Sequence, residues 1–207
     1  MELIDLFIED GDESGVSATA TVDLPAIDQP FFAFNKTRNL KKYKIQLGSQ
    51  KGSTFKPVNG DLQVLAGALM IPDLEIFRSE LLEDGTTKEY NVRFTSKTIN
   101  QIVEKFASSN INNSINQMHD ATKPVNAVMF QSFIINRELG VMPPLGQDHL
   151  PDGTWFGFIK IKDVKFWNEF IKTGIYKGFS VEGLFYEQPV ITEDEAEFVK
   201  SLVNNLD

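Results

Sequence analysis

Two short motifs carry residue types that could do acid–base and nucleophilic chemistry. The first, Asn116 to Asp120, contains His119, one of only two histidines in the chain. The second, Gly178 to Gly183, presents Ser180 two residues after a glycine. A serine becomes an effective nucleophile when a base within hydrogen-bond reach takes its proton. The two motifs therefore supply the minimum parts of a serine–histidine site.

The run around Ser180 has the pattern of a β-strand. Successive side chains of a strand point to opposite faces, so Ser180 and Glu182 should share one face and Phe179 and Val181 the other. A serine and a carboxylate on one face suit a half-exposed active site, and equally an ordinary solvent-facing strand. His119, in a polar loop, is in the same way either a base or a surface residue.

Other chemistries find less support. His149, in the loop that contains Asp148, could be a second base, but a surface histidine is the simpler interpretation. A metal site from His119, His149 and a carboxylate lacks the paired spacing of a zinc motif. The chain has no cysteine, no phosphate-binding or dinucleotide-binding glycine loop, and no G-x-S-x-G elbow of an α/β-hydrolase. We therefore expect neither a metal nor a cofactor.

Charge and hydropathy narrow the class of protein. The net charge of −9 argues against a nucleic-acid binder, because phosphate neutralisation needs clustered basic residues. The one basic cluster, Arg38 to Lys44, is better explained as a solvated loop. No apolar run approaches the roughly 20 residues needed to cross a bilayer. The acidic start, Met1 to Asp5, does not have the pattern of a signal peptide, so we expect an intracellular protein.

The 207 residues are enough for one domain with a real core. Strands and helices are not interleaved one by one, which favours an α+β fold with a mainly antiparallel sheet or barrel flanked by about three helices. We expect a single domain over 1–207, with a flexible polar excursion at about 35–60. The expected strands cover residues 3–8, 16–22, 62–71, 90–94, 125–135, 154–161 and 175–186. Three helices are expected. The first begins after Thr95 or Ser96, the second begins after Asp163, and the third covers about 192–206.

Several blocks of the sequence, in order, resemble one known family. They are Asp23 to Ile27 with Phe31 to Phe34, Gly67 to Asp73 with Ile76 to Arg78, Tyr90 to Phe94 with Ser96 to Ile99, Met118 to Asp120, Gln131 to Ile134, Gly153 to Trp155, and Gly174 to Gly183. As a set they resemble the phage prohead (capsid maturation) serine proteases of the XkdF-like type. That family is thought to share the β-barrel fold of herpesvirus assemblin.

The resemblance implies a serine endopeptidase with Ser180 as nucleophile and His119 as general base. Assemblin has a second histidine after its serine, and this chain has none after Ser180. Glu182 and Asp120 are candidates for that third role, and Glu182 is preferred. The implied substrates are scaffold and capsid proteins, and also the chain itself, inside a prohead assembling in the host cytoplasm. A homodimer follows by analogy only, and no nucleic acid or membrane partner is implied.

Three other functions stay open. The first is a non-catalytic capsid-assembly protein on the same fold, which the missing histidine favours. The second is a metal-dependent hydrolase that uses His119, His149 and the neighbouring carboxylates of Asp120 and Asp148. The third is a structural or tail-associated adaptor, which would be favoured if Ser180 and His119 lay far apart.

Overall fold

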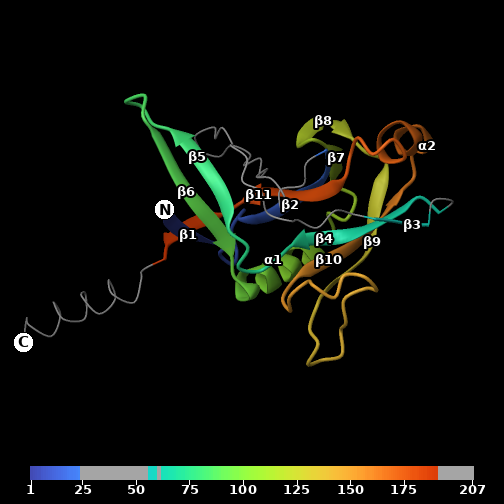
Figure 1. Cartoon of the computed structure of the whole chain (residues 1–207), viewed down its shortest axis with the longest axis horizontal. Helices are drawn as coiled ribbons and strands as arrows, with labels where there is room; N and C mark the ends of the chain where they lie inside the picture. Colours follow the sequence, from blue (N-terminus) through green and yellow to red (C-terminus); the bar gives the residue numbers. More distant parts are fainter. Residues whose placement is uncertain (24–55, 60–61, 191–207) are drawn as a thin grey trace, which may run out of the picture.

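The computed structural model describes residues 1–23, 56–59 and 62–190 (Figure 1). The predicted C-terminal helix at about 192–206, the basic cluster and most of the predicted excursion at about 35–60 lie outside these residues. One part of that excursion is described, and it forms the short strand β3 (Lys56–Asn59) rather than a loop.

The described strands form three sheets of four strands each. The first has the order β12-β1-β6-β5, the second β3-β4-β10-β9, and the third β11-β2-β7-β8. The first comprises β1 (Glu2–Phe7), β5 (Ile76–Leu81), β6 (Thr87–Phe94) and β12 (Tyr186–Pro189). The second adds β4 (Val64–Met70), β9 (Ala127–Ile134) and β10 (Trp155–Ile161) to β3. The third comprises β2 (Gly15–Val22), β7 (Ile115–Gln117), β8 (Asp120–Pro124) and β11 (Gly178–Leu184).

The predicted barrel is wrong, because none of the three sheets closes on itself. Some strands that follow each other in the chain join different sheets, as β1 and β2 do and as β11 and β12 do. Others pair directly, as β5 does with β6 and β9 with β10. Two of the strand pairs, β1 with β6 and β2 with β7, are parallel, and the other described pairs are antiparallel. Alternating sequence patterns identify strands but do not say which strands pair, and this is why the barrel could not be excluded from the sequence.

Only two helical segments occur among the described residues, both short. Helix α1 (Ser96–Ser108) begins as expected after Thr95, whose hydroxyl accepts from the Thr98 amide at 3.2 Å. The second segment joins α2 (Val164–Phe166) to the π-helical turn η1 (Trp167–Ile171), with Asp163 as its N-cap.

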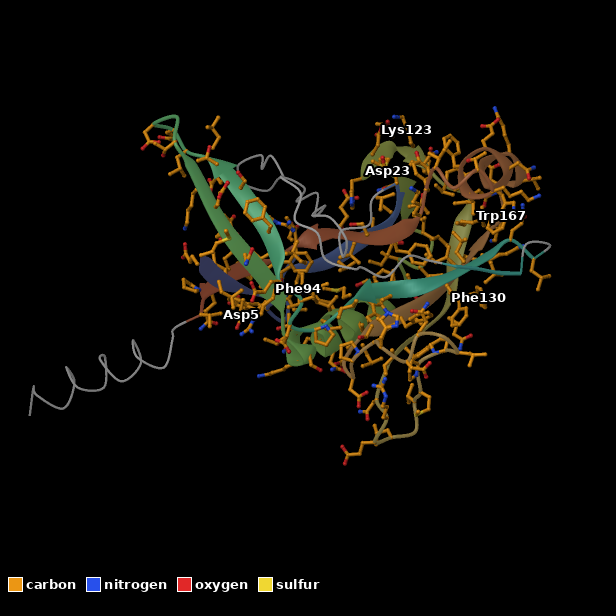
Figure 2. The ribbon with its side chains drawn as sticks, viewed as in Figure 1. Asp5, Asp23, Phe94, Lys123, Phe130 and Trp167 are labelled. Carbon is orange, nitrogen blue, oxygen red and sulfur yellow. The ribbon has the colours of Figure 1, made fainter. Side chains whose placement is uncertain are left out.

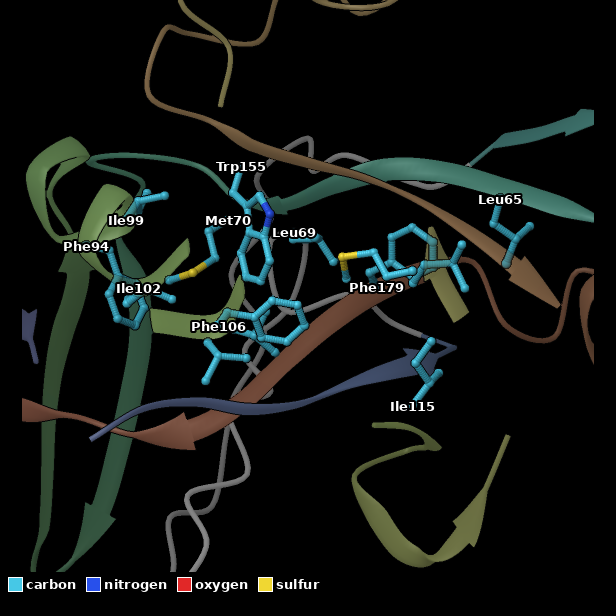
Figure 3. Packing of buried hydrophobic residues seen from close by; sticks show 14 of the residues in the cluster. Leu65, Leu69, Met70, Phe94, Ile99, Ile102, Phe106, Ile115, Trp155 and Phe179 are labelled. Carbon is cyan, nitrogen blue, oxygen red and sulfur yellow. The ribbon is translucent and has the colours of Figure 1, made fainter. Parts of the chain in front are cut away.

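The main core is formed by α1 and by buried side chains of all three sheets (Figure 3). Trp155, which is fully buried on β10, meets Phe106 of α1 edge-on, with ring centroids 5.0 Å apart. Ile99 and Ile102 complete the apolar face of the helix. Phe179 of β11 packs into the same cluster, which fixes the orientation of the strand that carries Ser180.

The sequence located the long apolar strands well and missed the short polar ones. The strands expected near residues 3–8, 16–22, 62–71, 90–94, 125–135 and 154–161 all have counterparts. The strand expected over 175–186 corresponds to β11, and β12 begins only at its last residue, Tyr186. Strands β5, β7 and β8 were not predicted, because they lack a long alternating pattern.

Candidate functional site

The third sheet carries the candidate site on the face opposite its core face. Phe179 and Val181 belong to the main core, so alternation along β11 turns Ser180 and Glu182 to the other side. That agrees with the sequence expectation of a shared face. The face is nevertheless buried, since Ser180 is 1% exposed and Glu182 4%. The expectation of a half-exposed strand face is therefore wrong.

Strand β2 separates the two strands that supply the site. Ala20 lies opposite Ser180 of β11 on one side and opposite Asn116 of β7 on the other. Residues directly opposite each other share a face of the sheet, so Asn116 and Ser180 point to the same side. The short side chain of Ala20 leaves the space between them open to longer side chains.

His119 sits in the tight turn that joins β7 to β8. Gln117 pairs with Asp120, which leaves only Met118 and His119 in the loop. Both have positive φ angles, 51° and 58°, as in the type I′ turns that usually take Asn-Gly. The Met118 amide donates to the Thr21 carbonyl at 3.1 Å, so the turn is tied to β2. At 119 a histidine occupies a backbone conformation that favours glycine.

The turn brings the His119 ring to Glu182. Nδ1 of His119 lies 3.7 Å from Oε2 of Glu182, and the two side chains are 4% and 6% exposed. This distance suits an ion pair when the ring is protonated and is longer than a hydrogen bond. Residues 63 positions apart in the chain are thus brought together in a buried pair.

Asn116 makes a second contact with the same carboxylate. Its Nδ2 donates to Oε2 of Glu182 at 2.9 Å, with both residues buried. Burial of the carboxylate raises the pKa of Glu182, but its interactions with His119 and Asn116 outweigh burial and the net shift is downward. Glu182 is therefore held as a carboxylate at neutral pH.

Asp120, the other candidate for the third role, is engaged elsewhere. Its Oδ1 accepts from the Thr122 hydroxyl at 2.6 Å, and its Oδ2 lies 2.9 Å from Nζ of Lys123. The Thr122 hydroxyl, followed by Lys123, lowers the pKa of Asp120 to about 2. Figure 2 shows Lys123 at the outer end of the sheet, above the end of β2. Asp120 thus stabilises its own hairpin, whereas Glu182 lies beside His119.

His149 does not join the site. It is exposed, as is Asp148, in the loop between β9 and β10. Figure 1 shows that loop on the opposite side of the molecule from β7 and β8. Within the described part of the chain, no three histidine, aspartate or glutamate side chains gather as a metal site. The metal-dependent alternative therefore lacks a ligand set there.

The structure explains why position 183, the last residue of the serine motif, is a glycine. Strand β11 changes register against β2 between Glu182 and Gly183. A Cβ at 183 would lie 2.1 Å from the carbonyl oxygen of Gly15, so only glycine allows the two backbones this close. The close approach anchors the strand immediately after Glu182.

Asn116 is the site residue for which the sequence indicated no role. It opens the motif that contains His119, three residues earlier, and that spacing was the available signal. The sequence does not indicate that Asn116 meets Glu182, because Glu182 lies on β11, and β2 separates β11 from β7 in the sheet.

Comparison with known proteins adds no relative. No family model matches the chain, and neither the curated proteins nor the solved structures include a match. In the described residues, no helix combines the length and the apolar character needed to cross a bilayer.

Proposed function

We propose that this chain is a serine endopeptidase with Ser180 as nucleophile, His119 as general base and Glu182 as the group that orients the base. The observation that carries the proposal is the buried His119–Glu182 pair, with 3.7 Å between Nδ1 and Oε2. Glu182 lies on β11, the strand that also carries Ser180. A nucleophile, a base and a carboxylate that orients the base are the three roles of a serine-protease triad.

The proposed chemistry follows from which ring nitrogen faces the carboxylate. Glu182 lies at the Nδ1 side of His119, so Nδ1 carries the ring proton and Nε2 is left to accept the Ser180 proton. The serine oxygen then attacks the peptide carbonyl, and the protonated ring donates to the leaving amine. The depressed pKa of Glu182 favours this assignment, because an ionised carboxylate stabilises the imidazolium that forms.

The substrate class comes from the sequence resemblance alone. It suggests scaffold and capsid proteins of an assembling phage prohead, in the host cytoplasm, with cleavage of the chain itself as a further reaction. Ser180 is 1% exposed, so a polypeptide reaches its hydroxyl only after a local opening. Such gating steps are common in enzymes, and we propose that the described conformation is the resting one.

A serine-directed fluorophosphonate probe, followed by intact-mass measurement and peptide mapping, tests the proposal. We expect one adduct on Ser180, lost in Ser180→Ala and in His119→Ala. Ser132, exposed on β9, supplies the control: Ser132→Ala should label like the wild type. Co-expression with the capsid and scaffold proteins proposed as its substrates should give cleavage that Ser180→Ala abolishes. Cleavage that persists in Ser180→Ala would refute the mechanism.

The second candidate is a non-catalytic capsid-assembly protein. The burial of Ser180 favours this candidate, because a serine without access to solvent is also expected in a protein that has lost its catalytic activity. It predicts neither labelling nor cleavage in the wild type, together with normal assembly of the capsid proteins in the same co-expression. The same two measurements therefore separate the candidates.

A further inference from the structure

Asn116 makes the least expected contact of the site. It is 6% exposed on β7, and its Nδ2 donates to Oε2 of Glu182 at 2.9 Å. That oxygen is also the one 3.7 Å from Nδ1 of His119. A single carboxylate oxygen thus faces the asparagine amide and the histidine ring together.

The reach of this contact depends on Ala20. Neighbouring strands of a sheet lie about 4.8 Å apart, so β11 and β7 are separated by about 10 Å across β2. Glu182 lies opposite Ala18 and Asn116 opposite the fully buried Ala20, so the two side chains bridge that gap diagonally across β2. A longer side chain at position 20 would stand between them, so the sequence of β2 permits the contact.

The chemistry fixes which way the Asn116 amide points. An ionised carboxylate only accepts hydrogen bonds, so the amide must turn Nδ2 toward Glu182. Its Oδ1 is then buried with no hydrogen-bond partner among the residues that the structure describes. A buried unsatisfied acceptor costs about 1–3 kcal/mol. An apolar residue of similar size would avoid that cost, but it would leave the buried Glu182 carboxylate without this donor.

We propose that Asn116 is a positioning residue that holds the Glu182 carboxylate against Nδ1 of His119. By occupying Oε2 from the side of β7, its Nδ2 limits rotation of the carboxylate and fixes the ring nitrogen that carries the proton. The catalytic consequence of this role depends on the proposed function. The orientation of the His119 ring does not depend on the proposed function, and it is measured separately.

The chain offers a simple spectroscopic test, because His119 and His149 are its only histidines. Imidazole ¹⁵N–¹H spectra above the titration range report the tautomer of each ring, and the exposed His149 is an internal reference. We expect His119 of the wild type to be the Nδ1–H tautomer. We expect Asn116→Leu, which removes the donor at similar volume, to give a mixture, and Asn116→Gln, which keeps an amide donor, to restore part of the preference.

Ile115→Val is the matched control, because Ile115 is buried on the core face of the same strand and does not contact Glu182. It should leave the His119 tautomer unchanged. If Asn116→Leu does not fold, Asn116→Ala removes the same donor. In an active enzyme, loss of the donor should lower kcat about 10-fold or more with KM nearly constant, as is typical when an orienting partner is removed.

The two proposals fail in different ways. A wild-type His119 without tautomer preference, or an Asn116→Leu variant that keeps the wild-type tautomer, overturns the positioning role even if Ser180 is labelled. Absence of labelling with loss of the Nδ1–H tautomer in Asn116→Leu overturns the enzyme and leaves the positioning role standing.

Discussion

Replacing His119 by glycine and by alanine isolates the backbone conformation of the turn. Both substitutions remove the imidazole ring and its contact with Glu182, so the difference between them reports mainly the backbone. His119 has a φ of 58°, in the left-handed region. That region costs a residue with a Cβ about 1–2 kcal/mol, and glycine avoids this cost.

The magnitude follows from two opposing effects. Glycine loses more chain entropy on folding than alanine, which costs about 0.5–1 kcal/mol. The centres of the two ranges leave a preference for glycine at position 119 of about 0.75 kcal/mol in the free energy of unfolding. Urea unfolding at neutral pH measures it as a higher midpoint for His119→Gly than for His119→Ala at equal slope.

Lys123 provides the matched control, because it lies on β8 of the same hairpin in ordinary strand conformation and its side chain is exposed. There the order should reverse, with Lys123→Ala more stable than Lys123→Gly by about 0.5–1 kcal/mol. If His119→Ala equals or exceeds His119→Gly in stability, the left-handed turn is refuted, and with it the account of how the ring reaches Glu182.

Three further outcomes are expected. Gly183→Ala should lower the free energy of unfolding by about 1–3 kcal/mol, because its Cβ would meet the Gly15 carbonyl at 2.1 Å; an unchanged urea midpoint would contradict the close approach. Phe106→Ala should cost about 3–5 kcal/mol by opening a cavity beside Trp155, and a loss below 1 kcal/mol in urea unfolding would argue against that packing. The pKa of Glu182 is lowered in the folded state, so its ionised form stabilises the fold above the unfolded pKa of about 4.3, and this contribution is lost as pH falls through the folded pKa. The stability advantage of the wild type over Glu182→Gln should therefore shrink as pH falls below about 5; an advantage independent of pH would show that the charge of Glu182 is not involved.

The sequence by itself determined the local elements and the candidate residues. Thr95 and Asp163 marked the starts of the helical segments, because a side-chain oxygen before an apolar helical pattern satisfies the first free amides. Alternation placed Ser180 and Glu182 on one face of β11, since the period of a strand is fixed by its backbone. These inferences needed only neighbours in the chain.

The tertiary structure alone decided how the sheets are divided and what surrounds the site. Pairing of β2 with both β7 and β11 brings Asn116 and His119 to Glu182 across 63 or more residues of chain, and no local pattern encodes that pairing. The three open sheets in place of a barrel, and the burial of Ser180, likewise depend on which strands meet. Strand propensity says that a segment is extended, whereas its partners are selected by packing of the whole chain.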